Sequence, residues 1–241
     1  MKRERFKRAQ NFEDSNIIRI TSQVLPIWKV LLSWIGMLAV FFLYLQITHW
    51  LLGPVIFTVG MVGILGYQYG FSSLRKFFGP MKSGTKRWIG GYLVLSFVFS
   101  LVIVFVFMPS VSSHTSMDAI NKLPFLDFLL VMGGMTFSLI GEEVLVAILA
   151  FPVFGYLNQL SSLKKSAFFL SSVFSSLIFG LAHLQVYDWD WFQCLVVTGL
   201  GRIFFNYAWR KSDSLWAGFW VHTINNWISF GISYMDISKL H

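Results

Sequence analysis

The chain has 241 residues, of which 56% are hydrophobic and only 12% are charged, with 26 Phe and 10 Trp among them. A soluble domain of this length needs more polar surface than this composition provides, so a soluble globular fold is excluded. The formal net charge is +8, but the basic residues gather in a few places that favour a membrane topology over nucleic-acid binding. The single Cys194 excludes an internal disulfide.

Residues 1–23 are polar and basic, and we expect them to form a cytoplasmic tail with a short interfacial helix around Phe6–Ile20 and no cleavable signal peptide. Most of the Lys and Arg residues lie in this tail, in the 71–87 loop, at 164–165 and at 210–211. Successive apolar segments put these four places on one side of the membrane. This asymmetry predicts a cytoplasmic N-terminus in the cell membrane. A lipid-binding role for the tail is an alternative use of the same charges.

Residues 24–241 are predicted to form a single transmembrane domain of about seven helices. The segment Trp88–Met108 has no charged residue over 21 positions, which is enough to cross a hydrocarbon core of about 30 Å. In chain order, the expected spans are 25–47, 51–69, 88–108, 125–154, 167–184, 192–209 and 215–234. The fourth would be about 45 Å long, so it must tilt, kink or begin in the interface. The predicted class is an all-α, polytopic membrane protein.

Two adjacent carboxylates, Glu142 and Glu143, are the only charged residues between Phe128 and Phe154. An ionisable side chain at bilayer depth costs about 2.5–3.5 kcal/mol on insertion scales, so its presence indicates function. On a helix the two side chains point about 100° apart, and at most one of them can point directly at a given centre.

Other polar residues interrupt the later spans. His183 lies four residues after Phe179, and Asn226 lies four after His222, so each pair shares a helix face. One carboxylate, two imidazoles and one carboxamide could activate a water and stabilise an oxyanion. Structural explanations remain open: asparagines can hydrogen-bond between helices for about 0.6 kcal/mol, and Arg202 can pair with a glutamate.

Three motifs carry a resemblance to a known family. Glu142-Glu143, Phe179–His183 and His222–Asn226 resemble, in order, the motifs EExxxR, FxxxH and HxxxN/D of the CPBP family, the CAAX proteases and bacteriocin-processing enzymes that are also called the Abi family. The resemblance covers about residues 125–230. It implies an intramembrane endopeptidase that hydrolyses a membrane-associated peptide or protein tail, such as a bacteriocin-like or signalling peptide, and whose surroundings are membrane lipid.

The resemblance also implies roles for individual residues. Glu142 would be the base that activates water, assisted by His183. His222 and Asn226 would stabilise the tetrahedral oxyanion, and Glu143 would orient the site. Phe179 and Arg202 are supporting candidates. A mechanism without a cofactor is favoured, although Glu142, His183 and His222 would also suit zinc.

One position departs from the family pattern. The arginine expected four residues after Glu143 is Ala147. We consider two explanations: Arg202 supplies the charge from the sixth span, or catalysis has been lost and the protein binds peptides as an immunity or regulatory protein. A small transporter with a proton relay is a third class, disfavoured because no repeated, broken spans are evident. The predicted topology also puts His183 nearer the outer surface than Glu142.

Overall fold

The structure, a computed structural model, describes residues 15–107 and 116–235. The predicted tail up to residue 14 and the outer-loop residues 109–115 lie outside this range. The described elements are α2 (Asn16–Thr21), α3 (Ile27–Gln46), α4 (Leu52–Tyr69), α5 (Phe71–Phe77), α6 (Thr85–Phe107), α7 (Ser116–Ile120), α8 (Phe125–Gln159), α9 (Ala167–Leu181), the 3-10 helix η2 (Leu184–Tyr187), the π-helix η3 (Gln193–Leu200), α10 (Ile203–Ser212) and α11 (Leu215–Tyr234). Every regular element in the described residues is helical, which confirms the predicted class.

Four of these helices, α3, α4, α6 and α8, are long and apolar enough to cross a membrane. Helix α9 is apolar but has only 15 residues. The sixth expected span is divided into η3 and α10 on either side of Gly201-Arg202. Helix α11 has 20 residues but is not among the four, and it contains His222, Asn225 and Asn226. The membrane character is therefore confirmed, while the count of seven spans stays a prediction.

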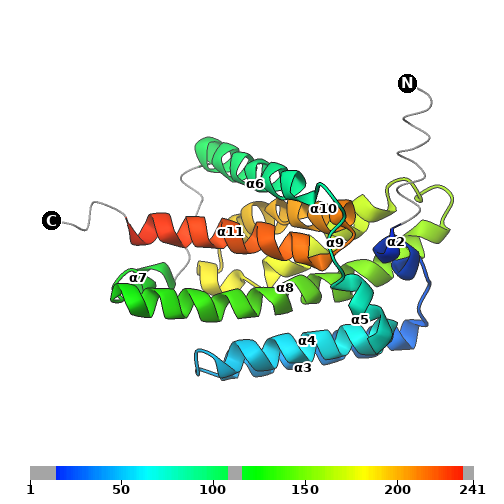
Figure 1. The fold of residues 1–241 in the computed structure, drawn as a ribbon, viewed down its shortest axis with the longest axis horizontal. Helices are drawn as coiled ribbons and strands as arrows, with labels where there is room; N and C mark the ends of the chain where they lie inside the picture. Colours follow the sequence, from blue (N-terminus) through cyan, green and yellow to red (C-terminus); the bar gives the residue numbers. More distant parts are fainter. Residues whose placement is uncertain (1–14, 108–115, 236–241) are drawn as a thin grey trace.

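Helix α8 is the central element (Figure 1), and it packs against α4, α9 and α11. Its 35 residues correspond to about 52 Å, more than a hydrocarbon core requires. Nearly all its residues from Gly141 to Phe154 are buried. Neighbours on several sides explain why this helix is apolar all round and lacks a polar stripe.

Pro152 lies inside α8 without ending it. Proline has no N–H, so the carbonyl of Ile148, four residues earlier, loses its helical donor. Two side chains replace that donor: Trp34 Nε1 and Gln68 Nε2 each lie 3.2 Å from the Ile148 oxygen. The interrupted turn of α8 is thereby tied to both α3 and α4.

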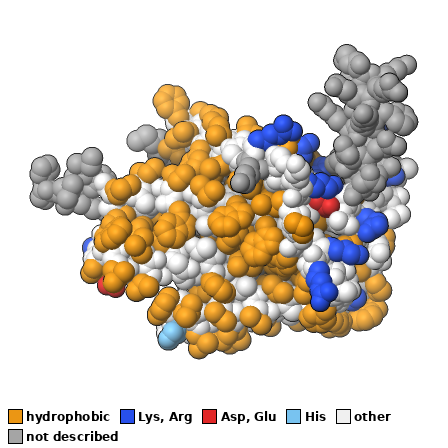
Figure 2. Space-filling view, viewed as in Figure 1, with side chains coloured by type: hydrophobic (Ala, Val, Ile, Leu, Met, Phe, Trp, Pro, Cys, Tyr) orange, Lys and Arg blue, Asp and Glu red, His pale blue; other side chains and the backbone are white. Residues whose placement is uncertain are grey.

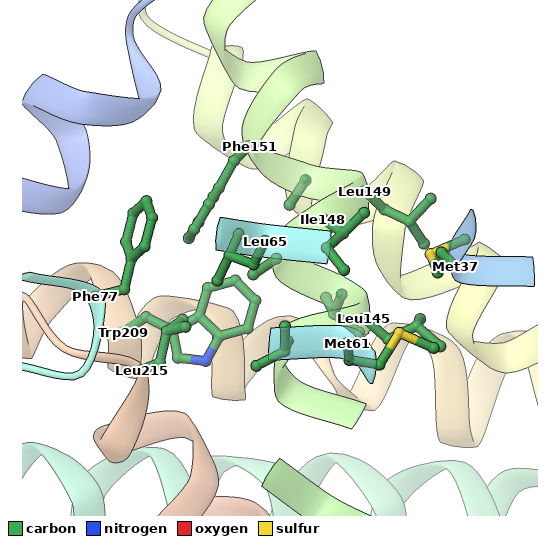
Figure 3. Packing of buried hydrophobic residues seen from close by; sticks show 14 of the residues in the cluster. Met37, Met61, Leu65, Phe77, Leu145, Ile148, Leu149, Phe151, Trp209 and Leu215 are labelled. Atoms are coloured by element: carbon green, nitrogen blue, oxygen red, sulfur yellow. The ribbon is translucent and has the colours of Figure 1, made fainter. Parts of the chain in front are cut away.

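An apolar cluster fills the space between α8 and its neighbours (Figure 3). Phe151 stacks on Phe77 with ring centroids 5.3 Å apart and contacts Trp209 edge-on at 5.8 Å. Met37, Met61 and Leu65 add side chains from α3 and α4. Trp209 belongs both to this core and to the polar site described below.

Asp213, in the turn between α10 and α11, fixes the N-terminal helix α2. Its buried carboxylate accepts hydrogen bonds from the Ser15 hydroxyl at 2.5 Å and from the backbone N–H groups of Asn16 and Ile17 at 2.9 Å each. Lys82 lies 3.6 Å away. Lys and Arg side chains gather at this end of the molecule (Figure 2), as the predicted charge asymmetry requires.

Candidate active site

Glu143 is almost completely buried in α8, at 1% exposure, and accepts three hydrogen bonds. Arg202 Nη2 lies 2.7 Å from Oε1, and Trp209 Nε1 lies 2.7 Å from Oε2. His222 Nδ1 is 2.9 Å from Oε1. A buried carboxylate needs such partners because burying an unpaired charge is costly. Glu143 is therefore a fixed anion whose oxygens are already occupied.

Arg202 supplies the positive charge that the sequence lacks at Ala147. It lies between η3 and α10, and its side chain is fully buried against Glu143. The guanidinium carbon is 4.3 Å from the centroid of the Phe179 ring, within range of a cation–π contact. The proposed pairing between Arg202 and a glutamate is present, and its partner is Glu143.

His222 connects the two glutamates. Its Nδ1 is 2.9 Å from Glu143 and 3.2 Å from Arg202 Nη1. A carboxylate only accepts and a guanidinium only donates, so the shorter contact assigns the proton to Nδ1, which donates it to Glu143. Nε2 then faces Glu142, whose Oε2 is 3.8 Å away.

Glu142 has a different environment from its neighbour. Its side chain is 20% exposed, and it forms no hydrogen bond with any described residue. The distance to His222 exceeds that of a direct hydrogen bond. Its lone pairs are therefore available to a ligand, whereas those of Glu143 are not.

His183 follows the end of α9 and lies beside Phe179. Its Nδ1 is 2.9 Å from the Phe179 carbonyl oxygen, which only accepts, so Nδ1 is the protonated nitrogen and Nε2 is left as an acceptor. The Phe179 ring is 4.4 Å from the His183 ring and 6.1 Å from the His222 ring, measured between centroids.

The helix bounds reduce the expected difference in depth between His183 and Glu142. Helix α8 continues to Gln159, past the predicted end at residue 154, so Glu142 lies 17 residues from the end that α8 shares with α9. His183 lies 16 residues from the start of α9. The two helices pack together, and both residues reach a similar level.

The two asparagines of α11 have different roles. Asn225 Nδ2 donates to the Ser96 hydroxyl at 3.1 Å and joins α11 to α6. Asn226, one turn after His222, is partly buried and has no hydrogen-bond partner in the described part of the chain. Within that part, Asn226 forms no hydrogen bond with either glutamate, so its placement on α11, one turn after His222, is what links it to the site.

Trp209 is the site residue that sequence reasoning missed. In the sequence it stands at the end of a predicted span, next to Arg210, where a tryptophan is typical of the membrane interface. It is instead 1% exposed, and a buried indole N–H needs an acceptor. That requirement is the only signal that could have assigned it to a buried carboxylate.

Metal ligation was the alternative for Glu142, His183 and His222. Within residues 15–107 and 116–235, no group of three His, Cys, Asp or Glu side chains is arranged to hold a metal ion. Both imidazoles use Nδ1 for a contact within the protein. The chemistry below is therefore derived from the side chains alone, and a zinc site stays a prediction.

An open, mostly apolar groove with a volume of about 620 Å³ runs along α11, and none of the site residues lines it. Its lining extends from Trp220 to Met235 and includes Thr223, the residue after His222. Thr136 of α8 forms the opposite side, where it accepts a hydrogen bond of 2.8 Å from Trp227 Nε1.

Comparison with known proteins agrees with the motifs. Residues 124–228 match a family model with the description "Type II CAAX prenyl endopeptidase Rce1-like". The matched range includes the site from Glu142 to Asn226, and it confirms the resemblance to the CPBP family. No curated protein and no solved structure matches the chain.

Proposed function

We propose that the protein is an intramembrane endopeptidase in which Glu142 activates water. The family match supports a membrane protease in general. The observation that carries the finer proposal is the contrast between the adjacent carboxylates: Glu143 accepts three hydrogen bonds, whereas Glu142 is partly exposed and faces His222 Nε2. A general base needs lone pairs that are free to take a proton.

In this mechanism the Glu142 carboxylate takes a proton from a water molecule, and the water oxygen attacks the peptide carbonyl carbon. The carbonyl oxygen becomes an oxyanion, to which His222 Nε2–H and the Asn226 amide donate. Glu142 then passes the proton to the amide nitrogen as the C–N bond breaks. His183, whose Nε2 is free to accept, orients the water.

Glu143 and Arg202 support this chemistry through His222. Donation from both ring nitrogens requires the imidazolium form, in which Nδ1–H donates to the Glu143 carboxylate. Arg202 holds Glu143 in place through the 2.7 Å contact between Nη2 and Oε1, with Phe179 packed on the guanidinium. The site thus tolerates alanine at position 147 because the cation comes from another helix.

The substrate class that suits this site is a membrane-associated peptide or protein tail, such as a bacteriocin-like or signalling peptide. The apolar groove along α11, between Trp220 and Met235, could hold an apolar segment of such a substrate, although its lining does not include the site residues. We further propose that the N-terminus is cytoplasmic, since the basic residues gather at the end where α2 lies.

A peptide-processing assay in cells tests this proposal. Glu142→Ala and His222→Ala should each abolish processing at membrane levels matched to the unmodified protein. Asp127→Ala is the control, because Asp127 is an exposed carboxylate in the first turn of the same helix, and it should leave processing unchanged. If both site variants process the peptide as well as the unmodified protein does, Glu142 and His222 are not the catalytic residues and this proposal fails.

A further inference from the structure

We infer that Trp209 is a positioning residue for the proposed hydrolysis, and that it acts through Glu143 on His222. This inference rests on the proposed function. Two of the three donors to Glu143, Arg202 Nη2 and His222 Nδ1, are bound to the same oxygen, Oε1. Among the described residues, Trp209 Nε1 is the only hydrogen-bond donor to Oε2.

This arrangement gives Trp209 a geometric function. Two donors on one oxygen hold Oε1 in place but still let the plane of the carboxylate pivot about that oxygen. A donor on the second oxygen fixes the plane of the group and therefore the direction in which Oε1 holds His222. The ring orientation of His222 sets where Nε2 points, and a small misplacement of a catalytic group slows the chemical step.

Trp209 is itself held rigidly. Its carbonyl oxygen accepts hydrogen bonds from the backbone of Asp213 and, at 3.3 Å, of Ser214. Its ring lies in the apolar cluster against Phe151 (Figure 3), with the centroids 5.8 Å apart. The indole N–H is therefore a preorganised donor, which costs no ordering when substrate binds.

Gly218 of α11 leaves the space in which this hydrogen bond forms. A Cβ atom at position 218 would overlap the indole nitrogen of Trp209 and would lie 2.5 Å from Oε2 of Glu143. Glycine inside a helix costs about 0.5–1 kcal/mol relative to alanine. Its presence here is explained by the Trp209–Glu143 contact.

The first experiment measures kcat and KM per folded molecule in proteoliposomes. Trp209→Phe keeps the aromatic packing and removes the N–H, and Gly218→Ala displaces the indole. Each should lower kcat about tenfold with KM unchanged, because the carboxylate of Glu143 would no longer hold the His222 ring in its catalytic orientation. Replacing Trp209 with benzothienylalanine, which has sulfur in place of N–H, should give the same loss.

Two matched controls separate positioning from simple destabilisation. Trp216→Phe removes another indole N–H, which donates to the Phe78 carbonyl at 3.0 Å, remote from Glu143. Gly63→Ala adds a Cβ with nothing within 4 Å. Both should keep the kcat of the unmodified protein. Equal kcat in Trp209→Phe and Trp216→Phe would overturn the inference.

A second readout does not depend on activity. In a ¹⁵N-tryptophan NMR spectrum, the indole signal that disappears in Trp209→Phe should shift in Glu143→Gln and in Gly218→Ala but stay in place in Glu142→Gln. If the signal shifts as expected while no peptide is cleaved, the contact stands and the proposed function fails. If the signal does not move in Glu143→Gln, the inference fails regardless of activity.

Discussion

Arg202→Met is expected to destabilise the folded protein by about 3–5 kcal/mol, the loss typical of a buried ion pair that is left with one partner. The Arg202 side chain is completely buried at 2.7 Å from Glu143, so the variant leaves an uncompensated carboxylate among apolar residues. Chemical unfolding in detergent measures the loss. Lys211→Met is the control, since Lys211 is exposed on the same helix, α10, and should change stability little.

A charge relocation makes this prediction specific. Ala147 is buried on α8, four residues after Glu143, and shares its helix face. In a protein that carries Arg202→Ala, the further change Ala147→Arg should recover part of the lost stability. Arg202→Ala removes the original guanidinium and so leaves space for the new one. Equal stability of Arg202→Met and Lys211→Met would contradict the assignment of Arg202 as the partner of Glu143.

The two glutamates are expected to respond in opposite ways to substitution by glutamine. Glu142→Gln should lower the cleavage rate by about 10²–10⁴-fold, the usual contribution of a general base. The free energy of unfolding of this variant should be unchanged, since the Glu142 side chain is partly exposed and makes no hydrogen bond to a described residue. Glu143→Gln should instead lower stability, because it leaves Arg202 buried without a counter-charge.

Parallel measurement of unfolding and of peptide cleavage in the two variants separates these roles. Asp127→Asn is the control: it shows how much the loss of a carboxylate from α8 changes stability and cleavage when that carboxylate lies outside the site. The proposed division of roles between the two glutamates fails if Glu142→Gln is as unstable as Glu143→Gln. It also fails if Glu143→Gln is as stable as the unmodified protein.

Much of the site could be predicted from the sequence because charged residues are so rare in the apolar segments. Glu142, Glu143 and Arg202 are the only such residues between Phe128 and Phe154 or within the sixth expected span. Buried charges must pair, so a contact between Arg202 and one glutamate was one of the two explanations that the sequence left open. The sequence alone did not determine which of the two glutamates Arg202 contacts, since that depends on how α8 is rotated relative to α10.

Other features depend on tertiary structure and left no clear local signal. The sixth expected span reads as one apolar run, yet it divides into a π-helix and α10 at Gly201-Arg202. Trp209 has the position of an interfacial tryptophan, and only the fold brings it to Glu143. Pro152 would normally be expected to break α8, but Trp34 and Gln68 satisfy the carbonyl that it leaves free.

The proposed reaction is hydrolysis of a peptide bond by a water molecule that Glu142 activates. The most direct measurement incubates the purified protein, in proteoliposomes, with a library of apolar membrane peptides in H₂¹⁸O and analyses the products by mass spectrometry. We expect one ¹⁸O atom in each newly formed carboxyl group, and no such products with Glu142→Gln. Products that persist in Glu142→Gln, or no cleavage of any peptide by the unmodified protein, would contradict this proposal.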